Sequence, residues 1–416
     1  MAETRLAPDR RVSAGWMSLL ALAQMGVIMA MTVGNQILLP SHVARIDPQH
    51  KEASLAVVFA VAAVCTIVAN PLFGALSDRT RARMGRRRPW IAGGALVCAA
   101  SLVFLSRQDS LAGLVVGWAV AQLAFTAALA TAIATVPDQV PISQRGKASA
   151  LAGVGQLAGP LLGGVVVTVV ATGSQAGFVA MAVLVLLLVL PFSLFTKEPA
   201  SAPADLPPFG PRSLLRSFKV SPRKHPDFAW AWLSRFLITL TLAMAIGYLQ
   251  YYLRDGVGYE ALFPGSTVEQ GVVVLVAVFT LSSVAPTLVA GWLSDRFGNR
   301  RAAVFVGGLT MAASGLVLTC LTSWPAAIAA SVLLGAGYGM FAAVDQAMVT
   351  QLLPADADRG KDLGIVSLAN SASSTFGPVI AAPLVTSAGG YPLMYAVAAA
   401  FAALGACLIW RIRSVR

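Results

Sequence analysis

The sequence predicts an all-α, polytopic membrane protein with 12 transmembrane helices in two six-helix parallel repeats. Of its 416 residues, 57% are apolar and only 12% are charged, and the mean hydropathy is +0.75. A soluble globular domain carries about 25% charged residues. A water-soluble protein is therefore excluded. Long apolar runs recur along the whole chain, and its two halves share short polar motifs.

The apolar runs predict the membrane spans, because a helix needs roughly 20 apolar residues to cross a bilayer. The first six spans are expected over residues 15–39, 54–76, 90–106, 111–137, 147–171 and 176–196. The last six are expected over residues 228–252, 271–293, 302–322, 325–353, 363–387 and 391–411. The first run is too long for a cleaved signal sequence, so we expect it to remain as a helix.

A polar stretch separates the two sets of spans. Residues 198–227 are rich in proline and then in lysine and arginine, which oppose a packed core. We therefore expect an N-terminal six-helix bundle over residues 1–197, a cytoplasmic linker over 198–227, and a C-terminal six-helix bundle over 228–416.

The positions of the basic residues predict the orientation. Of the 30 lysines and arginines, Arg45, Lys51, Arg107 and Arg254 fall in loops on one side, and Arg235 falls within a span. All the others lie in the opposite loops and the two terminal segments. Under the positive-inside rule this places both termini in the cytoplasm, in the cytoplasmic (inner) membrane. The net charge of +12 thus reflects topology, and we expect a lipid bilayer and no nucleic acid as partner.

The two halves contain an internal repeat. The motif Gly-x-x-Ser-Asp-Arg occurs at Gly74–Arg79 and again at Gly291–Arg296, an offset of 217 residues. An Arg-Gly-Lys triplet begins at Arg145 and again at Arg359, an offset of 214. Since six spans separate the copies, they have the same orientation, as in secondary transporters built from parallel repeats.

These paired motifs resemble the cytoplasmic signature of the major facilitator superfamily, and the resemblance covers essentially the whole chain. It implies alternating access, with the two aspartates engaging clustered arginines and neighbouring helix ends as a conformational latch. In the alternative interpretation the charges only set the topology. The latch candidates are Gly74, Asp78, Arg79, Gly85, Arg86, Arg87, Arg145, Gly291, Asp295, Arg296 and Arg359.

Two further resemblances point to different branches. The long first loop, Ser77 to Ile91, is similar to that of glycoside–pentoside–hexuronide cation symporters and their sucrose-transporter-like relatives, which implies a sugar-like solute. The fifth span resembles the glycine–proline pattern of drug:proton antiporters, although packing between the two halves would select the same small residues. That pattern comprises Gly146, Gly155, Gly159, Pro160, Gly163 and Gly164.

Charges within the spans suggest the coupling site. Arg235 and Asp345 lie at a similar depth from the cytoplasmic surface, and a buried charge requires a partner. An Arg235–Asp345 pair would be either a proton-coupling site or a permanent structural ion pair. Asp138, at the cytoplasmic end of the fourth span, is the second proton candidate, and we expect it rather to pair with loop arginines. Sodium-coupled members of the symporter family that the first loop resembles carry carboxylates in the first, second and fourth helices. Here the first two spans have none and the fourth has only Asp138, so the resemblance argues against a sodium site.

The expected cavity wall is polar and largely uncharged. Amides, hydroxyls and aromatic faces suit a neutral polar solute. The candidates are Gln24, Asn35, Gln36, Trp118, Gln122, Tyr248, Tyr252, Tyr338 and Asn370.

The sequence therefore predicts a proton-coupled secondary transporter of a small polar organic solute such as a sugar or glycoside. The alternative is a drug or metabolite:proton antiporter working in efflux. We expect no enzyme, because no catalytic or metal-ligating pattern occurs and the three histidines are all expected in loops. We expect no cofactor and no metal, a small-molecule substrate and protons as partners, and a monomer.

Overall fold

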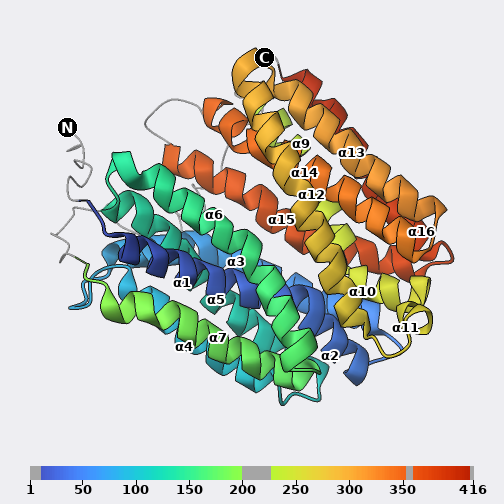
Figure 1. The fold of residues 1–416 in the computed structure, drawn as a ribbon, viewed down its shortest axis with the longest axis horizontal. Helices are drawn as coiled ribbons and strands as arrows, with labels where there is room; N and C mark the ends of the chain where they lie inside the picture. Colours follow the sequence, from blue (N-terminus) through green and yellow to red (C-terminus); the bar gives the residue numbers. More distant parts are fainter. Residues whose placement is uncertain (1–10, 199–225, 353–358, 413–416) are drawn as a thin grey trace. The chain divides into compact units, whose positions relative to one another are not determined.

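The computed structural model describes residues 11–198, 226–352 and 359–412. The predicted all-α architecture is confirmed (Figure 1). In the described part of the chain, the isolated β-bridge between Ala82 and Gly85 is the extent of β-structure. The predicted linker 198–227 lies almost wholly outside the described residues.

The chain forms two compact units, and α3 contributes to both. Unit 1 comprises Met1–Ile46 and Val64–Gly210, and unit 2 comprises Asp47–Ala63 and Pro211–Arg416. The first part of the second predicted span, up to Ala63, is thus grouped with the C-terminal helices.

The helices up to residue 195 are α1 (Ala14–Val33), η1 (Gly34–Leu38), α2 (Leu39–Ile46), α3 (Lys51–Arg79), α4 (Arg88–Leu105), α5 (Leu111–Gln139), α6 (Ile142–Val165), η2 (Val166–Val170) and α7 (Ser174–Phe195). The later helices are α9 (Pro226–Gly247), α10 (Leu249–Tyr251), η3 (Tyr252–Val257), α11 (Tyr259–Leu262), α12 (Val268–Phe297), α13 (Arg300–Cys320), α14 (Trp324–Leu352), α15 (Arg359–Thr386), α16 (Gly390–Leu408) and η4 (Ile409–Arg411).

Each of the 12 predicted spans coincides with one of these helices. Among the described residues, 11 helices are long and apolar enough to cross a membrane. The remaining span corresponds to α15, of which Ala372–Thr386 is counted as a shorter apolar helix. Most of these helices begin a few residues before the predicted start, because the polar ends of a helix carry no hydrophobic signal. In the seventh span α9 already ends at Gly247, and α10 and η3 continue the chain.

Polar caps mark several helix starts. The Ser110 hydroxyl accepts from the Gly113 amide at 3.2 Å at the start of α5, and the Asn299 side chain accepts from the Ala302 amide at 3.2 Å at the start of α13. Thr267 forms a capping box with Gln270 at the start of α12. Each cap satisfies amides that have no partner within the helix.

The first span is longer than predicted. It passes through a π-helical segment, η1, and continues as α2 to Ile46. His42 is consequently buried in α2, where its ring nitrogens lie 2.8 Å from the Ser174 hydroxyl and 2.8 Å from the Gln108 carbonyl oxygen. The expectation that all histidines lie in loops was wrong for His42. His225 lies outside the described residues.

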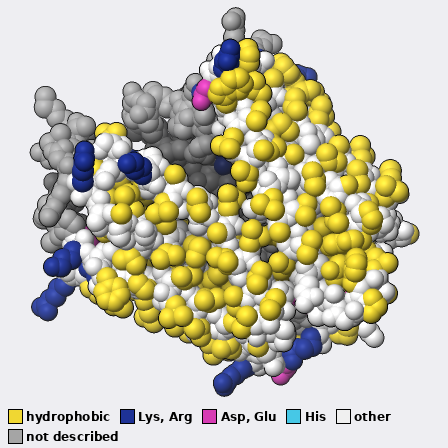
Figure 2. Space-filling model, viewed as in Figure 1, with side chains coloured by type: hydrophobic (Ala, Val, Ile, Leu, Met, Phe, Trp, Pro, Cys, Tyr) yellow, Lys and Arg dark blue, Asp and Glu magenta, His cyan; other side chains and the backbone are white. Residues whose placement is uncertain are grey.

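The helix surfaces are those of a protein solvated by lipid. Large apolar side chains are exposed along α3, α7 and α12, for example Val64 at 57%, Leu187 at 63% and Leu281 at 70%. Figure 2 shows hydrophobic side chains spread over the visible faces, with lysine and arginine gathered toward the helix ends. This distribution agrees with the spans predicted from hydropathy.

Candidate functional site

Unit 2 contains a buried ion pair within two membrane helices. Arg235 on α9 donates through Nη1 to Oδ2 of Asp345 on α14, and the two side chains are 10% and 6% exposed. The other carboxylate oxygen, Oδ1 of Asp345, is buried and has no hydrogen-bond partner in the described part of the chain. The sequence proposed this pair from equal depth, and the structure brings the two side chains together. A carboxylate with a free oxygen retains capacity for a proton.

Hydroxyl groups join α9 to α15 beside this pair. The Ser373 hydroxyl donates to the Phe236 carbonyl at 2.9 Å, and the Thr239 and Ser373 hydroxyl oxygens are 2.7 Å apart. Trp232 and Phe236 stack with ring centroids 5.5 Å apart. Polar groups and aromatic faces therefore both lie within about one turn of Arg235 on α9.

Two other candidates of unit 2 lie near this region. Tyr338 is on α14, two turns before Asp345, and its ring packs against Phe279 and Phe341 at centroid distances of 5.8 and 6.3 Å. Asn370 belongs to α15, but its side chain lies outside the described residues.

In unit 1, two unpartnered polar atoms lie one turn apart on α5. Nε1 of Trp118 and Oε1 of Gln122 are buried without a hydrogen-bond partner among the described residues. The Trp118 ring is fully buried and packs edge-on against Phe125 at 5.8 Å. It also lies over Gly34 of η1, where an added Cβ would be 2.3 Å from the ring. One donor and one acceptor are thus left without a partner one turn apart on α5, and the ring that carries the donor lies beside the π-helical turn of the first span.

The remaining unit 1 candidates lie on the first span. Gln24 is buried on α1 and its side chain donates to the Ala132 carbonyl at 3.5 Å. Asn35 and Gln36 are half-buried in η1. π-Helical turns inside α-helices frequently occur at functional sites.

The two tyrosine candidates of the seventh span, Tyr248 and Tyr252, are buried against other elements and are not exposed as the wall of a cavity would be. The Tyr248 hydroxyl lies 3.1 Å from the carbonyl oxygens of both Glu52 and Pro378, and its side chain is fully buried. The Tyr252 ring is buried against Tyr395 with centroids 5.2 Å apart, although its hydroxyl has no hydrogen-bond partner in the described residues. The sequence predicted that Tyr248 faces the solute. In the structure its hydroxyl instead bonds carbonyl groups of two other helices, α3 and α15.

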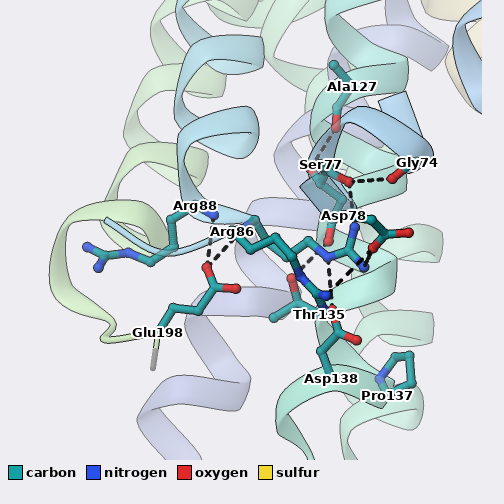
Figure 3. Close-up of polar contacts among 12 residues, drawn as sticks. Gly74, Ser77, Asp78, Arg86, Arg88, Ala127, Thr135, Pro137, Asp138 and Glu198 are labelled. Carbon is teal, nitrogen blue, oxygen red and sulfur yellow. Dashed lines mark hydrogen bonds and ion pairs between the residues drawn. The ribbon is translucent and has the colours of Figure 1, made fainter. Parts of the chain in front are cut away.

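A dense charged network occupies the loop after α3 in unit 1 (Figure 3). The Arg87 guanidinium contacts Oδ1 of Asp78 at 2.6 Å, Oδ2 of Asp138 at 2.9 Å and the Ser77 hydroxyl at 2.5 Å. Arg86 also contacts Oδ2 of Asp138, at 2.5 Å. Both arginine side chains are less than 10% exposed. Asp138 therefore lies in an ion-pair network, as expected for the pairing with loop arginines.

Sequence reasoning missed Glu198, which completes this network. Its Oε2 accepts from the backbone amides of Arg87 at 2.9 Å and Arg88 at 3.3 Å. Gly85 has φ +97°, and a Cβ at that position would lie 2.4 Å from the same carboxylate oxygen. Only glycine permits this close approach. In the sequence, Glu198 stands at the edge of a proline-rich stretch and carries no motif signal.

The other candidates of this loop have local roles. Gly74 accepts the Ser77 hydroxyl through its carbonyl at 2.9 Å. Arg145 donates to the carbonyls of Val140 at 3.1 Å and Pro137 at 3.0 Å, which terminates α5. Arg79 bonds the Ala75 carbonyl of its own helix at 3.1 Å.

The second copy of the motif is arranged differently. Asp295 is exposed and makes no ion pair in the described part of the chain. Arg296 lies over the rings of Trp292 at 5.2 Å and Phe297 at 5.9 Å. Gly291 has open space around it. The side chain of Arg359 lies outside the described residues. The expectation that both aspartates engage clustered arginines is thus met by the contacts of Asp78. For Asp295 it stays a prediction, because no such contact occurs among the described residues.

The glycines of the fifth span pack against the first span. On α6, added Cβ atoms would lie within 3.2 Å of atoms of α1 at three positions, and within 2.5 Å at one of them. These positions are Gly155, Gly159 and Gly163. Gly164 is buried, Pro160 lies inside the helix, and Gly146 has no neighbour within 4 Å. Since α1 and α6 belong to the same unit, the expected packing between halves is corrected to packing within unit 1.

Comparison with known families decides the class. A family model described as MFS/sugar transport protein matches residues 20–411. The chain belongs to the major facilitator superfamily. As a member of this superfamily it is a multi-pass membrane transporter of a small-molecule substrate. Among curated proteins, none matches this chain significantly in sequence.

Two solved structures show the same fold as this major facilitator protein. The crystal structure of the nucleoside transporter NupG has a TM-score of 0.76 at 13% identity, covering 95% of this chain and 98% of that one. A bacterial homologue of the human lysosomal transporter Spinster, in an inward-facing and unoccupied conformation, has a TM-score of 0.73 at 14% identity, covering 97% of this chain and 99% of that one. At these identities the likeness concerns the fold alone.

Proposed function

We propose that this major facilitator protein is a proton-coupled symporter of a small neutral polar solute, sugar- or glycoside-like, working by alternating access. The proposal depends chiefly on one observation, the buried Arg235–Asp345 pair with a free carboxylate oxygen. The positive-inside pattern supports insertion in the cytoplasmic membrane with both termini in the cytoplasm.

Asp345 is the proposed proton site. An adjacent guanidinium favours the ionised carboxylate, whereas burial without that partner favours the protonated acid. If Arg235 moves away from Asp345 during the transport cycle, the carboxylate gains proton affinity, and if it returns, the proton is released. Proton binding is thereby linked to the conformation of unit 2.

Trp118 and Gln122 support a neutral solute with hydroxyl groups. A hydroxyl both donates and accepts, and the two open atoms on α5 are one donor, Nε1, and one acceptor, Oε1. Leaving either atom unpaired costs about 1–3 kcal/mol, so a solute that pairs both gains affinity. A charged solute would lack a counter-charge at this position.

The glycine–proline pattern of α6 does not favour antiport over symport as the function of this protein. The close contacts of Gly155, Gly159 and Gly163 with α1 account for the small residues. Efflux of a drug or metabolite in exchange for protons is therefore the alternative outcome of the test.

The test uses purified protein in liposomes that enclose a pH-sensitive dye. Sucrose, a methyl glucoside, uridine and ethidium are added in turn, with uridine included because the structural neighbour NupG is a nucleoside transporter. Acidification of the interior on adding one of the three neutral solutes supports symport. Proton release from acid-loaded liposomes on adding ethidium supports antiport instead. Saturable solute uptake with no proton movement in either direction overturns proton coupling. Protein-free liposomes are the control.

A further inference from the structure

The second copy of the repeated motif ends α12, a span that buries little of its surface. Among the described residues, 17% of the most apolar stretch of α12 is buried, against 33–56% in the other candidate spans. Large apolar side chains are exposed on this helix at Leu281 (70%), Leu288 (70%), Trp292 (57%) and Phe297 (67%). A large exposed apolar face on a membrane protein is a contact surface for lipid.

The length of this apolar face matches one leaflet of a bilayer. From Leu288 to Phe297 the helix rises about 14 Å, at about 1.5 Å per residue. One leaflet supplies about half of the roughly 30 Å hydrocarbon core. The positive-inside orientation places the end of α12 at the cytoplasmic surface, where Trp292 joins the interfacial belt of aromatic residues. An acyl chain lying along this face would therefore bring its head group to the turn after Phe297.

Arg296 is held at this end of the apolar face by two aromatic rings. Its guanidinium carbon lies 5.2 Å from the ring centroid of Trp292 and 5.9 Å from that of Phe297. Arg296 is exposed and makes no hydrogen bond or ion pair within the described part of the chain. A cation–π contact uses the face of the guanidinium and leaves its N–H donors open to an anion.

Arg301 is a second cation of the same turn that lacks a partner. Gly298, with φ +65°, and Asn299 are the two residues between α12 and α13, and Arg301 is the second residue of α13. Nε of Arg301 is buried without a hydrogen-bond partner, and its guanidinium makes no ion pair with a described residue. A buried charged donor is normally paired, because leaving it unpaired is costly. The missing partner of Arg301 is therefore an anion.

The charge of the whole turn also favours an anion. Asp295 is its single carboxylate, against the three arginines at positions 296, 300 and 301. In the first copy of the motif the following loop supplies Arg87 as the partner of Asp78. In the second copy Arg296 and Arg301 make no ion pair with a described residue, so their charge is available to a ligand.

We propose that the turn between α12 and α13 and the adjoining face of α12 bind one anionic phospholipid of the cytoplasmic leaflet. Arg296 and Arg301 hold its phosphate, and an acyl chain lies along Leu288 and Trp292. A zwitterionic lipid has no net charge to balance the two arginines, and a soluble anion does not cover the apolar face. The lipid site goes beyond the proposed function and does not depend on proton coupling.

Native mass spectrometry of the purified full-length protein tests this site. The protein in detergent is titrated with phosphatidylglycerol, phosphatidylcholine and phosphatidylethanolamine that carry the same acyl chains. The dissociation constant of the first bound lipid is then compared among the three head groups. We expect phosphatidylglycerol to bind about tenfold more tightly than either zwitterionic lipid, because arginines near the membrane surface attract anionic head groups.

Three variants locate the binding. Arg296→Gln/Arg301→Gln should reduce the preference for phosphatidylglycerol to about twofold or less. Arg81→Gln/Arg83→Gln removes two exposed arginines of the first loop and is the matched control, which should keep the full preference. Asp295→Asn removes the carboxylate of the turn and should tighten phosphatidylglycerol binding roughly two- to threefold, because charges repel each other within a Debye length of about 10 Å. Tighter binding cannot result from misfolding.

Equal affinity of the wild type for the three lipids overturns the lipid site. So does a control that loses the preference as fully as Arg296→Gln/Arg301→Gln, since the attraction would then be general to the basic loops. Glycerol 1-phosphate has the phosphate without acyl chains, and if it displaces the lipid at equal concentration, the turn binds a soluble anion instead. Size-exclusion profiles identify a variant that does not fold, and Asp295→Asn then carries the comparison. Absence of proton movement in liposomes would overturn the proposed function and leave these affinities unaffected.

Discussion

At the scale of single residues, Asp345 shows how far depth in a span predicts a contact. Arg235 and Asp345 are 110 positions apart in sequence, yet their similar depth made them candidate partners, and the structure joins them. Depth follows from counting residues along a helix at about 1.5 Å each. The free Oδ1 of Asp345 could not be foreseen in this way, because it depends on which side chains of neighbouring helices reach the carboxylate.

Asp345→Asn should abolish accumulation of the solute against its gradient. The amide preserves the shape of the carboxylate but cannot take up and release a proton, so the ratio of internal to external solute should fall to about 1 while downhill exchange continues. Uptake of the solute identified in the liposome screen, with and without an imposed pH gradient, measures this. Thr310→Val, whose hydroxyl donates to the Val306 carbonyl of its own helix α13, is the control. Accumulation that persists in Asp345→Asn would leave the pair with a structural role only.

At the scale of elements, α6 shows that one glycine pattern supports two interpretations. Its sequence fits the antiporter pattern at every position, but a glycine pattern alone does not say which helix lies opposite. In the structure that helix is α1, and the close approach is greatest at Gly163, where an added Cβ would be 2.5 Å from the Met29 side chain. Packing thereby accounts for a pattern that the sequence left open.

Gly163→Ala should therefore destabilise the protein by about 1–3 kcal/mol, because the added methyl group overpacks the α1–α6 contact. Gly153→Ala is the matched control: it lies on the same helix with no atom within 4 Å of the new methyl group, and alanine favours helix, so its effect should be neutral or slightly stabilising. Thermal unfolding in detergent compares the two. Equal melting temperatures of the two variants would contradict the close packing of α1 and α6 at Gly163.

At the scale of the whole molecule, the two copies of the short repeated motif differ in the contacts that the described residues make. The two Gly-x-x-Ser-Asp-Arg motifs are identical at their fixed positions, yet Asp78 is paired with Arg87, whereas Asp295 is exposed without an ion pair in the described residues. The first copy is followed by a long arginine-rich loop, whereas only Gly298 and Asn299 separate α12 from α13. For Asp78, a residue outside the motif, Arg87, supplies the partner.

This asymmetry predicts unequal effects of the same substitution. Asp78→Asn removes a partner of the buried Arg87 side chain and should lower stability by about 1 kcal/mol, allowing for the partial exposure of Asp78. Asp295→Asn removes an exposed carboxylate and should change stability by no more than a few tenths of a kcal/mol. Thermal unfolding of the two variants side by side is the measurement. A larger loss of stability in Asp295→Asn than in Asp78→Asn would contradict the conclusion that Asp78 makes the stronger contacts.

The sequence by itself determined the membrane class, the 12 spans, the repeat and the charge pattern that predicts orientation. These depend on hydrophobicity and charge counted along one helix, which are local properties. Only the tertiary structure decided that Glu198 joins the Arg87 network, that the Tyr248 hydroxyl bonds carbonyl groups of other helices, and that α6 packs on α1. Each of these depends on distances of a few ångströms between helices remote in sequence, and such distances follow from how side chains pack in three dimensions.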